Sequence, residues 1–167
     1  MKHLFTFFIL LSFFTVDANA QKKPRLSPMD SVSTEIRGGK TIKIVYSRPT
    51  LRERALKDII TFGEVWRTGA NEATTFETDS DLTIEGKRLP AGKYSLYTIP
   101  AKTQTTVIFN KNWDQWGTKY DEDFDALRIK VPTRQAKRST EQLTIDIRKN
   151  GTVSIDWEKM QINFKVK

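Results

Sequence analysis

The C-terminal part of the chain alternates apolar and polar residues with a period of two, the pattern of a β-strand with one face in a core. The alternation runs through 143–147 and stops at Asn150-Gly151, a dipeptide typical of tight β-hairpin turns. It resumes in 153–157 and, after another turn, in 160–166. This pattern predicts a three-strand antiparallel meander with one buried and one wet face.

Shorter segments rich in β-branched and aromatic residues precede the meander, separated by turn-forming residues. One segment, 51–60, has apolar residues at helical spacing and predicts a short helix. The whole pattern favours an all-β fold over an α/β fold. The expected architecture is an antiparallel β-sandwich, and a jelly roll is one type of sandwich that fits. We expect strands at 41–47, 64–68, 73–78, 82–85, 94–99 and 105–110, a turn-rich connector at 86–92 and a basic loop at 132–140.

The N-terminus has the layout of a secretory signal peptide. A basic start precedes an apolar run from Leu4 to Val16, and small residues then lead to a predicted cut before Gln21. The run is shorter than the ~20 residues that a membrane-spanning helix needs. We therefore expect a soluble mature protein, periplasmic or secreted, without a transmembrane segment. The predicted organisation is a signal peptide at 1–20, an exposed lead-in at 21–33 and a single domain at 34–167.

The composition excludes several classes of catalytic site. The chain contains no cysteine, which excludes disulfides, thiol nucleophiles and zinc–thiolate sites. Its only histidine, His3, falls in the predicted signal peptide, so Ser-His-Asp catalysis is excluded for the mature chain. An enzyme built on this sequence would need carboxylates, lysine, tyrosine or a bound metal. We expect no cofactor.

The segment E-V-W-R-T-G-A-N-E-A-T-T-F at 64–76 places polar side chains among strand-forming residues. A tight loop here would bring Arg67, Asn71 and Glu72 together, with Arg48 as a fourth member. One interpretation is a structural bridge from Arg67 or Arg48 to Glu72. The other is a recognition pocket for a carboxylate, a sugar or a phosphate.

Two tryptophans, Trp113 and Trp116, flank Asp114 and Gln115 in a polar loop. Aromatic rings beside hydrogen-bonding side chains are typical of sugar-binding surfaces, because a ring face covers apolar C–H groups. Packing of both rings in the core is the alternative.

Acidic residues suggest two further kinds of site. Asp121, Asp123 and Asp125 have the spacing of the first calcium-loop ligands, but the glycine and glutamate that an EF-hand also needs are absent. We therefore predict no metal site and interpret these residues as an acidic turn. For carboxylate catalysis on glycans, Glu72 is the first residue to test.

Four segments carry a family resemblance: Y-S-R-P at 46–49, V-W-R-T-G-A-N-E-A-T-T at 65–75, L-P-A-G-K-Y-S-L-Y-T-I-P at 89–100 and I-F-N-K-N-W-D-Q-W-G at 108–117. Together they resemble the exported bacterial family known as domain of unknown function 2911, common in Bacteroidetes. The resemblance implies export and a compact, mostly β domain, and it supplies no activity or cofactor. The chain departs from the family's usual linker, a Gly-Arg pair and a Val-Pro-Tyr-Gly run, with Glu53-Arg54 and 60–63.

The net charge of +8 favours an acidic partner, although solubility alone also explains it. Nucleic acid is a poor candidate, because the chain combines an export signal with no stacking motif. We expect a non-catalytic module that binds a sugar, an anionic small molecule or an envelope component. The alternatives are a carboxylate glycan hydrolase and a purely structural envelope partner. The oligomeric state does not follow from the sequence.

Overall fold

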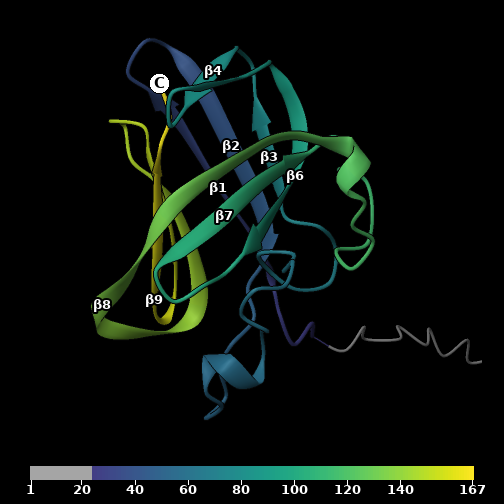
Figure 1. The fold of residues 1–167 in the computed structure, drawn as a ribbon, viewed down its shortest axis with the longest axis vertical. Helices are drawn as coiled ribbons and strands as arrows, with labels where there is room; N and C mark the ends of the chain where they lie inside the picture. The colour runs from purple at the N-terminus through teal and green to yellow at the C-terminus, as the bar shows by residue number, and fades with distance from the viewer. Residues whose placement is uncertain (1–23) are drawn as a thin grey trace, which may run out of the picture.

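The structure, a computed structural model, describes residues 24–167, and the predicted signal peptide lies outside them. The described chain is antiparallel β (Figure 1), with one seven-stranded sheet in the order β1-β2-β3-β6-β7-β8-β9 and a two-stranded sheet of β4 and β5. The predicted all-β fold is confirmed. The elements are β1 (Met29–Ile36), β2 (Lys40–Ser47), η1 (Leu56–Asp58), β3 (Thr75–Thr78), β4 (Leu82–Ile84), β5 (Lys87–Leu89), β6 (Gly92–Ile99), β7 (Gln104–Asn110), η2 (Glu122–Phe124), β8 (Asp125–Ile147) and β9 (Thr152–Lys165).

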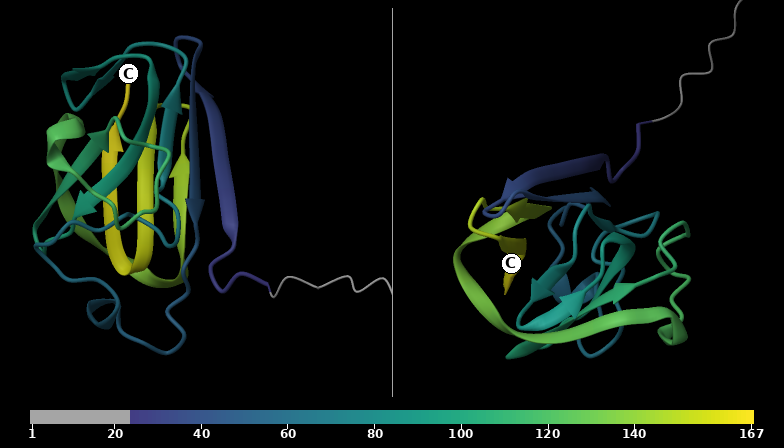
Figure 2. Two further views of the ribbon diagram at one scale, coloured as in Figure 1. Left: turned by 90° about the vertical axis from the view of Figure 1, so that its right-hand side faces the viewer. Right: turned by 90° about the horizontal axis from the view of Figure 1, so that it is seen from above.

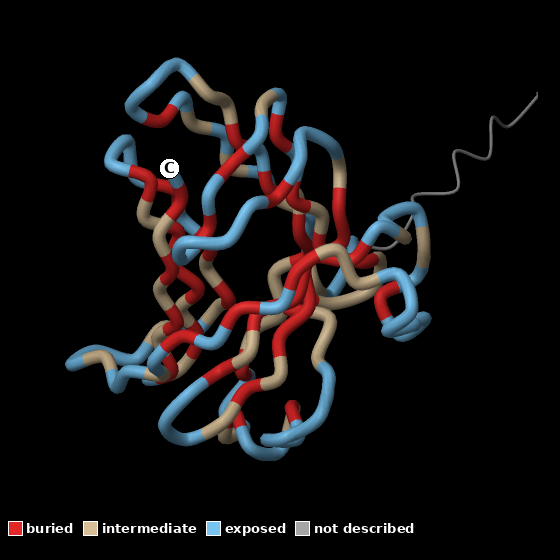
Figure 3. The backbone as a smooth tube through the Cα atoms, turned by 45° about the horizontal axis from the view of Figure 1, so that its top comes forward, coloured by how far each residue is buried: buried red, intermediate tan, exposed pale blue. Residues whose placement is uncertain are grey.

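The seven-stranded sheet curls until its last strands return to its first. The N–H of Leu51 donates to the carbonyl of Glu141 at 3.0 Å, and the N–H of Leu143 donates to Pro49 at 3.0 Å. Seen from above, the β9 hairpin lies between β1–β2 and the curve of β8 (Figure 2, right). The core fills the space inside this curl, and Figure 3 shows buried residues alternating along the strands.

The β9 segment folds back on itself at Glu158, whose φ is 53°. Its two arms lie side by side (Figure 2, left), and the N–H of Val166 donates to the carbonyl of Gly151 at 2.8 Å. With the end of β8 they form the predicted meander, and the alternating apolar side chains all point inward. The buried set comprises Leu143, Ile145, Ile147, Val153, Ile155, Trp157, Met160, Ile162, Phe164 and Val166.

The helix predicted at 51–60 is wrong except for the short 3-10 turn η1. Arg52 and Glu53 have φ angles of 53° and 63°, which a right-handed helix does not allow. The backbone N–H of Arg52 instead donates to the side chain of Glu141 at 2.9 Å. The apolar residues that suggested a helix serve to dock an irregular loop, and Leu56 is buried in the core.

Three further expectations are corrected. The strand predicted at 64–68 is only an isolated bridge between Trp66 and Thr98, because Thr68 has a φ of 50° and leaves the extended region. The connector at 86–92 contains β5. The basic loop at 132–140 is part of β8, where it continues the sheet. In addition, β1 begins inside the predicted lead-in.

Candidate functional site

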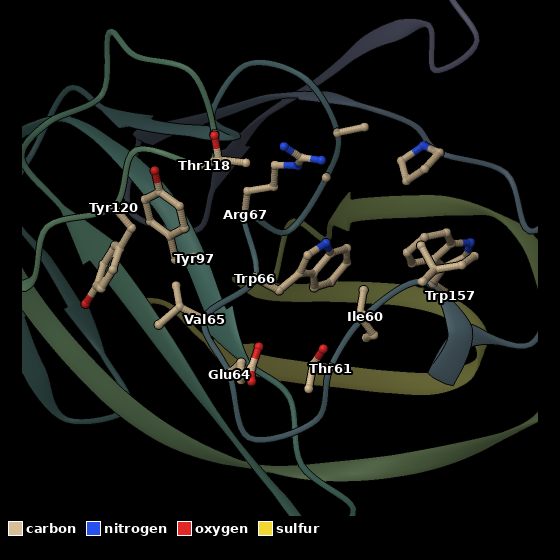
Figure 4. Close-up of a pocket in the computed structure, with 15 residues that line it drawn as sticks. Ile60, Thr61, Glu64, Val65, Trp66, Arg67, Tyr97, Thr118, Tyr120 and Trp157 are labelled. Atoms are coloured by element: carbon tan, nitrogen blue, oxygen red, sulfur yellow. The ribbon is translucent and has the colours of Figure 1, made fainter.

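A pocket with a volume of about 490 Å³ opens beside the loop that follows η1 (Figure 4). It is formed by the 59–70 segment, the 117–120 turn and Tyr97 of β6, with Trp157 of β9 contributing to the wall. We call it the Arg67 pocket, after the arginine that lines it. Its volume falls in the range of small-ligand sites, roughly 300–1,000 Å³.

Four aromatic rings line this pocket in two pairs. The Trp66 ring stacks on Trp157 with centroids 5.6 Å apart and an interplanar angle of 19°. Tyr97 meets Tyr120 edge to face at 4.9 Å. Trp157 is fully buried, so it holds the more exposed Trp66 ring in a fixed orientation. The pocket therefore has preformed flat apolar faces.

Arg67 supplies the positive charge of the pocket (Figure 4). Within residues 24–167, its guanidinium makes neither a salt bridge nor a side-chain hydrogen bond. The aliphatic stem is nevertheless closely packed, because a Cβ placed on Gly117 would lie 2.5 Å from its Cδ. The structure thus fixes the stem of Arg67 and leaves its five N–H donors available.

Backbone hydrogen bonds connect the loop at 69–73, which follows Arg67, to the segment 115–117. Asn71 adopts a left-handed conformation, with a φ of 60°, and its carbonyl accepts from the N–H of Gly117 at 2.9 Å. The N–H of Ala73 donates to the carbonyl of Gln115 at 3.0 Å. Gly69 is needed for a close approach, since a Cβ there would lie 2.7 Å from Oγ1 of Thr74.

Arg48 does not join this pocket. Its guanidinium forms an ion pair with Asp30 at 3.0 Å and donates to the carbonyl of Leu143 and the hydroxyl of Thr144, each at 3.0 Å. These contacts connect the end of β2 to β1 and β8. Arg48 therefore has a structural part, tying the first strands of the curled sheet to its last.

Glu72 pairs with Arg25, and neither of the arginines expected from the sequence pairs with it. The two carboxylate oxygens accept from Arg25 at 2.7 and 3.0 Å. This hydrogen bond is the main reason that the pKa of Glu72 is lowered from its ordinary value of 4.5. Glu72 is accordingly a charged group in a surface ion pair and a poor proton donor near neutral pH.

Both tryptophans of the 113–116 loop are exposed. The interpretation that they pack in the core is therefore wrong. Trp113 and Trp116 are 39% and 49% exposed. The ammonium of Lys93 lies 4.1 Å from the centroid of the Trp113 ring, a cation–π contact. Trp116 pairs with Glu72 in an isolated bridge. The loop reaches the pocket through Gln115, whose side-chain amide donates to the Tyr97 hydroxyl at 3.2 Å.

The acidic turn is held by its own hydrogen bonds. Asp121 caps η2 by accepting from the N–H of Asp123, and Asp125 accepts from the Tyr120 hydroxyl at 2.7 Å. Burial, followed by the bond to Asp125, raises the pKa of Tyr120 to about 12. Among residues 24–167, no three His, Cys, Asp or Glu side chains gather as a metal-binding group. The turn instead orients Tyr120, whose ring lines the pocket.

Sequence reasoning did not find the aromatic lining of the site. Trp66 lies inside the 64–76 segment but was read only as part of a strand, and Trp157 was correctly placed on the inward face of the meander. Tyr97 and Tyr120 lie in separate segments, and nothing in their spacing brings them together. The one available signal was Trp66, which precedes Arg67 in the polar motif.

Of the six predicted binding residues, Arg67 alone lines the pocket. Asn71 and Glu72 lie on the adjoining loop, Trp116 is bridged to Glu72, and Arg48 and Trp113 have their partners elsewhere. None of the helices in the described part of the chain has both the length and the apolar character needed to cross a membrane.

Comparison with known proteins agrees with the sequence motifs. Neither the curated proteins nor the solved structures give a match. One family does match, under the description "Protein of unknown function (DUF2911)", and its match covers residues 27–166. That span includes all of the sheet and every residue that lines the Arg67 pocket. The chain belongs to this family.

Proposed function

We propose that the protein is an exported, non-catalytic binding module whose Arg67 pocket takes a sugar that carries an anionic group. The observation that carries this proposal is an arginine with a packed stem and unpaired donors in a pocket lined by aromatic rings. Arginine presents planar, paired N–H donors that match carboxylate and phosphate oxygens. The free donors of Arg67 are therefore suited to an anionic group.

The aromatic rings account for the sugar part of the ligand. The partly exposed rings of Trp66 and Tyr120, held in place by the buried rings of Trp157 and Tyr97, offer flat apolar surfaces on which sugar C–H groups can lie. The hydroxyl group of Thr118, an exposed residue that lines the pocket, provides a partner for sugar hydroxyls. A small anion without a ring would use Arg67 and leave these faces bare.

A hydrolytic function receives less support from the geometry. Glycan hydrolysis by carboxylates needs two acids on either side of the bond, one of them with a raised pKa. Among the residues that line the Arg67 pocket, all within the described chain, Glu64 is the only carboxylate. The hydrogen bond from Arg25 lowers the pKa of Glu72, the acid that the sequence offers for this reaction.

Export to the periplasm or beyond the cell is part of the proposal. It rests on the basic, apolar and small-residue pattern of residues 1–20. Fractionation of cells that express the full chain tests it directly. Cleavage before Gln21 and recovery outside the cytoplasm are expected, whereas an uncleaved cytoplasmic protein would refute this part.

The experiment for the binding function is a fluorescence titration of the mature protein with glucuronate, glucose 1-phosphate, glucose and inorganic phosphate. Because Trp66 is half-buried in the pocket wall, an occupied pocket should change the tryptophan emission. We expect saturable changes with the two anionic sugars and weaker binding of glucose and phosphate. Equal, non-saturable responses to all four compounds would contradict the proposal, and release of phosphate from glucose 1-phosphate would indicate an enzyme.

A further inference from the structure

A second pocket, with a volume of about 450 Å³, also borders η1 and the loop that follows it. It is formed by Leu56 and Lys57 of η1, Phe62 of the following loop, Lys102 before β7, and the neighbouring segments 133–135 of β8 and 158–160 of β9. It shares no lining residue with the Arg67 pocket. Both η1 and the bend of β8 lie at the lower end of the molecule in Figure 1. We call it the basic-rim pocket.

The interior of this pocket is apolar. Leu56 and Met160 are buried residues of its lining, and both belong to the main hydrophobic core. Phe62 adds an aromatic ring that is 40% exposed and therefore accessible to a ligand. Met160 has a flexible, unbranched side chain that adapts to ligands of different shape. An apolar chain can therefore lie on this surface without displacing a buried polar group.

The rim of the pocket carries an excess of positive charge. Four cations line it, namely Lys57, Lys102, Arg134 and Lys159, against one carboxylate, Glu158. Glu158 is already engaged, because it accepts a hydrogen bond from the backbone N–H of Leu56 at 3.3 Å. Within the described chain, none of the four cations makes a salt bridge. An anionic group at the rim would meet several unpaired cations at once.

The bend of β8 extends this positive surface. Register shifts between Gln135 and Thr140 interrupt its pairing with β9, so the strand bends where Lys137 and Arg138 are exposed. Both residues belong to the basic segment 132–140, which the sequence predicts as a loop. In the structure they follow the segment 133–135, which lines the pocket.

From these observations we infer that the basic-rim pocket binds a single-chain anionic amphiphile, with its acyl chain against Phe62 and Met160 and its head group at the lysines and Arg134. Apolar area and positive charge are both required, because neither a neutral chain nor a small anion uses the whole surface. The class includes free fatty acids and anionic lysolipids. This site is independent of the Arg67 pocket and of the function proposed for it.

Isothermal titration calorimetry of the mature protein with dodecanoate below its micellar concentration tests the inference. Two matched compounds separate the contributions. Octanoate has the same head group and a shorter chain, and each buried methylene should contribute about fourfold in affinity, equivalent to ~0.8 kcal/mol. Dodecyltrimethylammonium has the same chain and the opposite charge. Tight binding of dodecanoate alone is expected, and equal binding of the cation would overturn the inference.

Matched variants locate the site. Lys102→Gln with Arg134→Gln should weaken dodecanoate binding at least tenfold, while Lys43→Gln with Lys111→Gln removes two exposed cations elsewhere and should not. Phe62→Ser should also weaken it, whereas Phe124→Ser, which changes a ring that is 42% exposed outside this pocket, should have no effect. Arg67→Gln, in the other pocket, should leave dodecanoate binding unchanged. Equal losses in the target and control variants would refute the assignment.

A last comparison separates a pocket from a membrane surface. Vesicles of phosphatidylglycerol present the same negative charge on a bilayer, and lysines near such a surface gain attraction without a pocket. Binding to vesicles that is lost in Lys102→Gln with Arg134→Gln, together with no binding of monomeric dodecanoate, would overturn the inference in favour of a peripheral membrane contact. Dodecanoate binding that persists without vesicles supports it.

Discussion

The backbone of Gly117 packs against the side chain of Arg67. A Cβ added at position 117 would be 2.5 Å from Cδ and 2.9 Å from Cβ of the arginine. Gly117→Ala should therefore force Arg67 out of its conformation. We expect a loss of about 1–3 kcal/mol in unfolding free energy from overpacking and a larger relative loss of anionic-sugar binding. Chemical denaturation and fluorescence titration measure the two effects.

Gly38→Ala is the control for that variant. Gly38 has a φ of 102° with nothing near its Cβ position, so the substitution strains only the backbone of the turn between β1 and β2. It should cost about 1–2 kcal/mol without altering ligand affinity. If Gly117→Ala bound ligand as well as Gly38→Ala does, the packing of Arg67 would have no bearing on the site.

Truncation of Arg48 should cost more stability than truncation of Arg67. Arg48→Ala removes an ion pair to Asp30 and two hydrogen bonds to β8, which should cost about 1–3 kcal/mol of stability. Arg67→Ala removes no polar contact within the described chain, so its cost should stay near 1 kcal/mol or below. Urea denaturation of both variants checks the difference. A larger loss in Arg67→Ala would mean that this arginine holds the fold together.

The ion pair between Arg25 and Glu72 should show up as a coupling that depends on pH. The hydrogen bond from Arg25 lowers the pKa of Glu72, so the contribution is present above the ordinary value of 4.5 and lost as the pH falls through the lowered value. Arg25 and Glu72 are 53% and 37% exposed, so the coupling should be small and reduced by salt. A double-mutant cycle measures it from pH 7 down through the acidic range until the Glu72 carboxylate is protonated. Coupling that stays unchanged once the carboxylate is protonated would contradict the assignment.

The Tyr120 hydroxyl should lose its proton only at a pH well above the ordinary tyrosine pKa of 10.0, and this loss should weaken the fold. Burial and Asp125 raise its pKa from 10.0 to about 12, so the folded state holds the proton more tightly than the unfolded state. Its contribution to stability is present below pH 10 and disappears as the pH rises through about 12. Ultraviolet titration of the phenolate gives the pKa of Tyr120. In Tyr120→Phe, the fall in unfolding free energy over this window should be shallower than in wild type, and an unchanged slope would refute the shift.

The fold was more predictable from the sequence than the site because strand periodicity is a local signal. The alternation in 143–166 corresponds to a buried face in the structure, including the second turn at Glu158. Local signals failed where tertiary contacts decided the backbone. Leu56 suggested a helix through its spacing, but its segment docks against β8 and β9 through Glu141 and Glu158.

The site was only partly predictable, because its members come from distant segments. The 64–76 motif contains Arg67, which lines the pocket, but Asn71 and Glu72 of the same motif lie on the adjoining loop. The partner of Glu72 was missed because Arg25 lies in a segment that looked like an exposed lead-in. Trp157 was read correctly as a core residue, but the ring that it stacks on depends on the curl of the whole sheet.

The central claim is that Arg67 is held in place to bind an anionic group on a sugar. The most direct measurement is calorimetric titration of wild type and Arg67→Gln with both glucuronate and glucose. We predict that wild type prefers glucuronate by about tenfold or more, in line with ~1.5–3 kcal/mol for a charge-assisted hydrogen bond, and that Arg67→Gln abolishes this preference while retaining residual binding of both sugars. A preference for glucuronate that survives in Arg67→Gln, or its absence from wild type, would contradict the account.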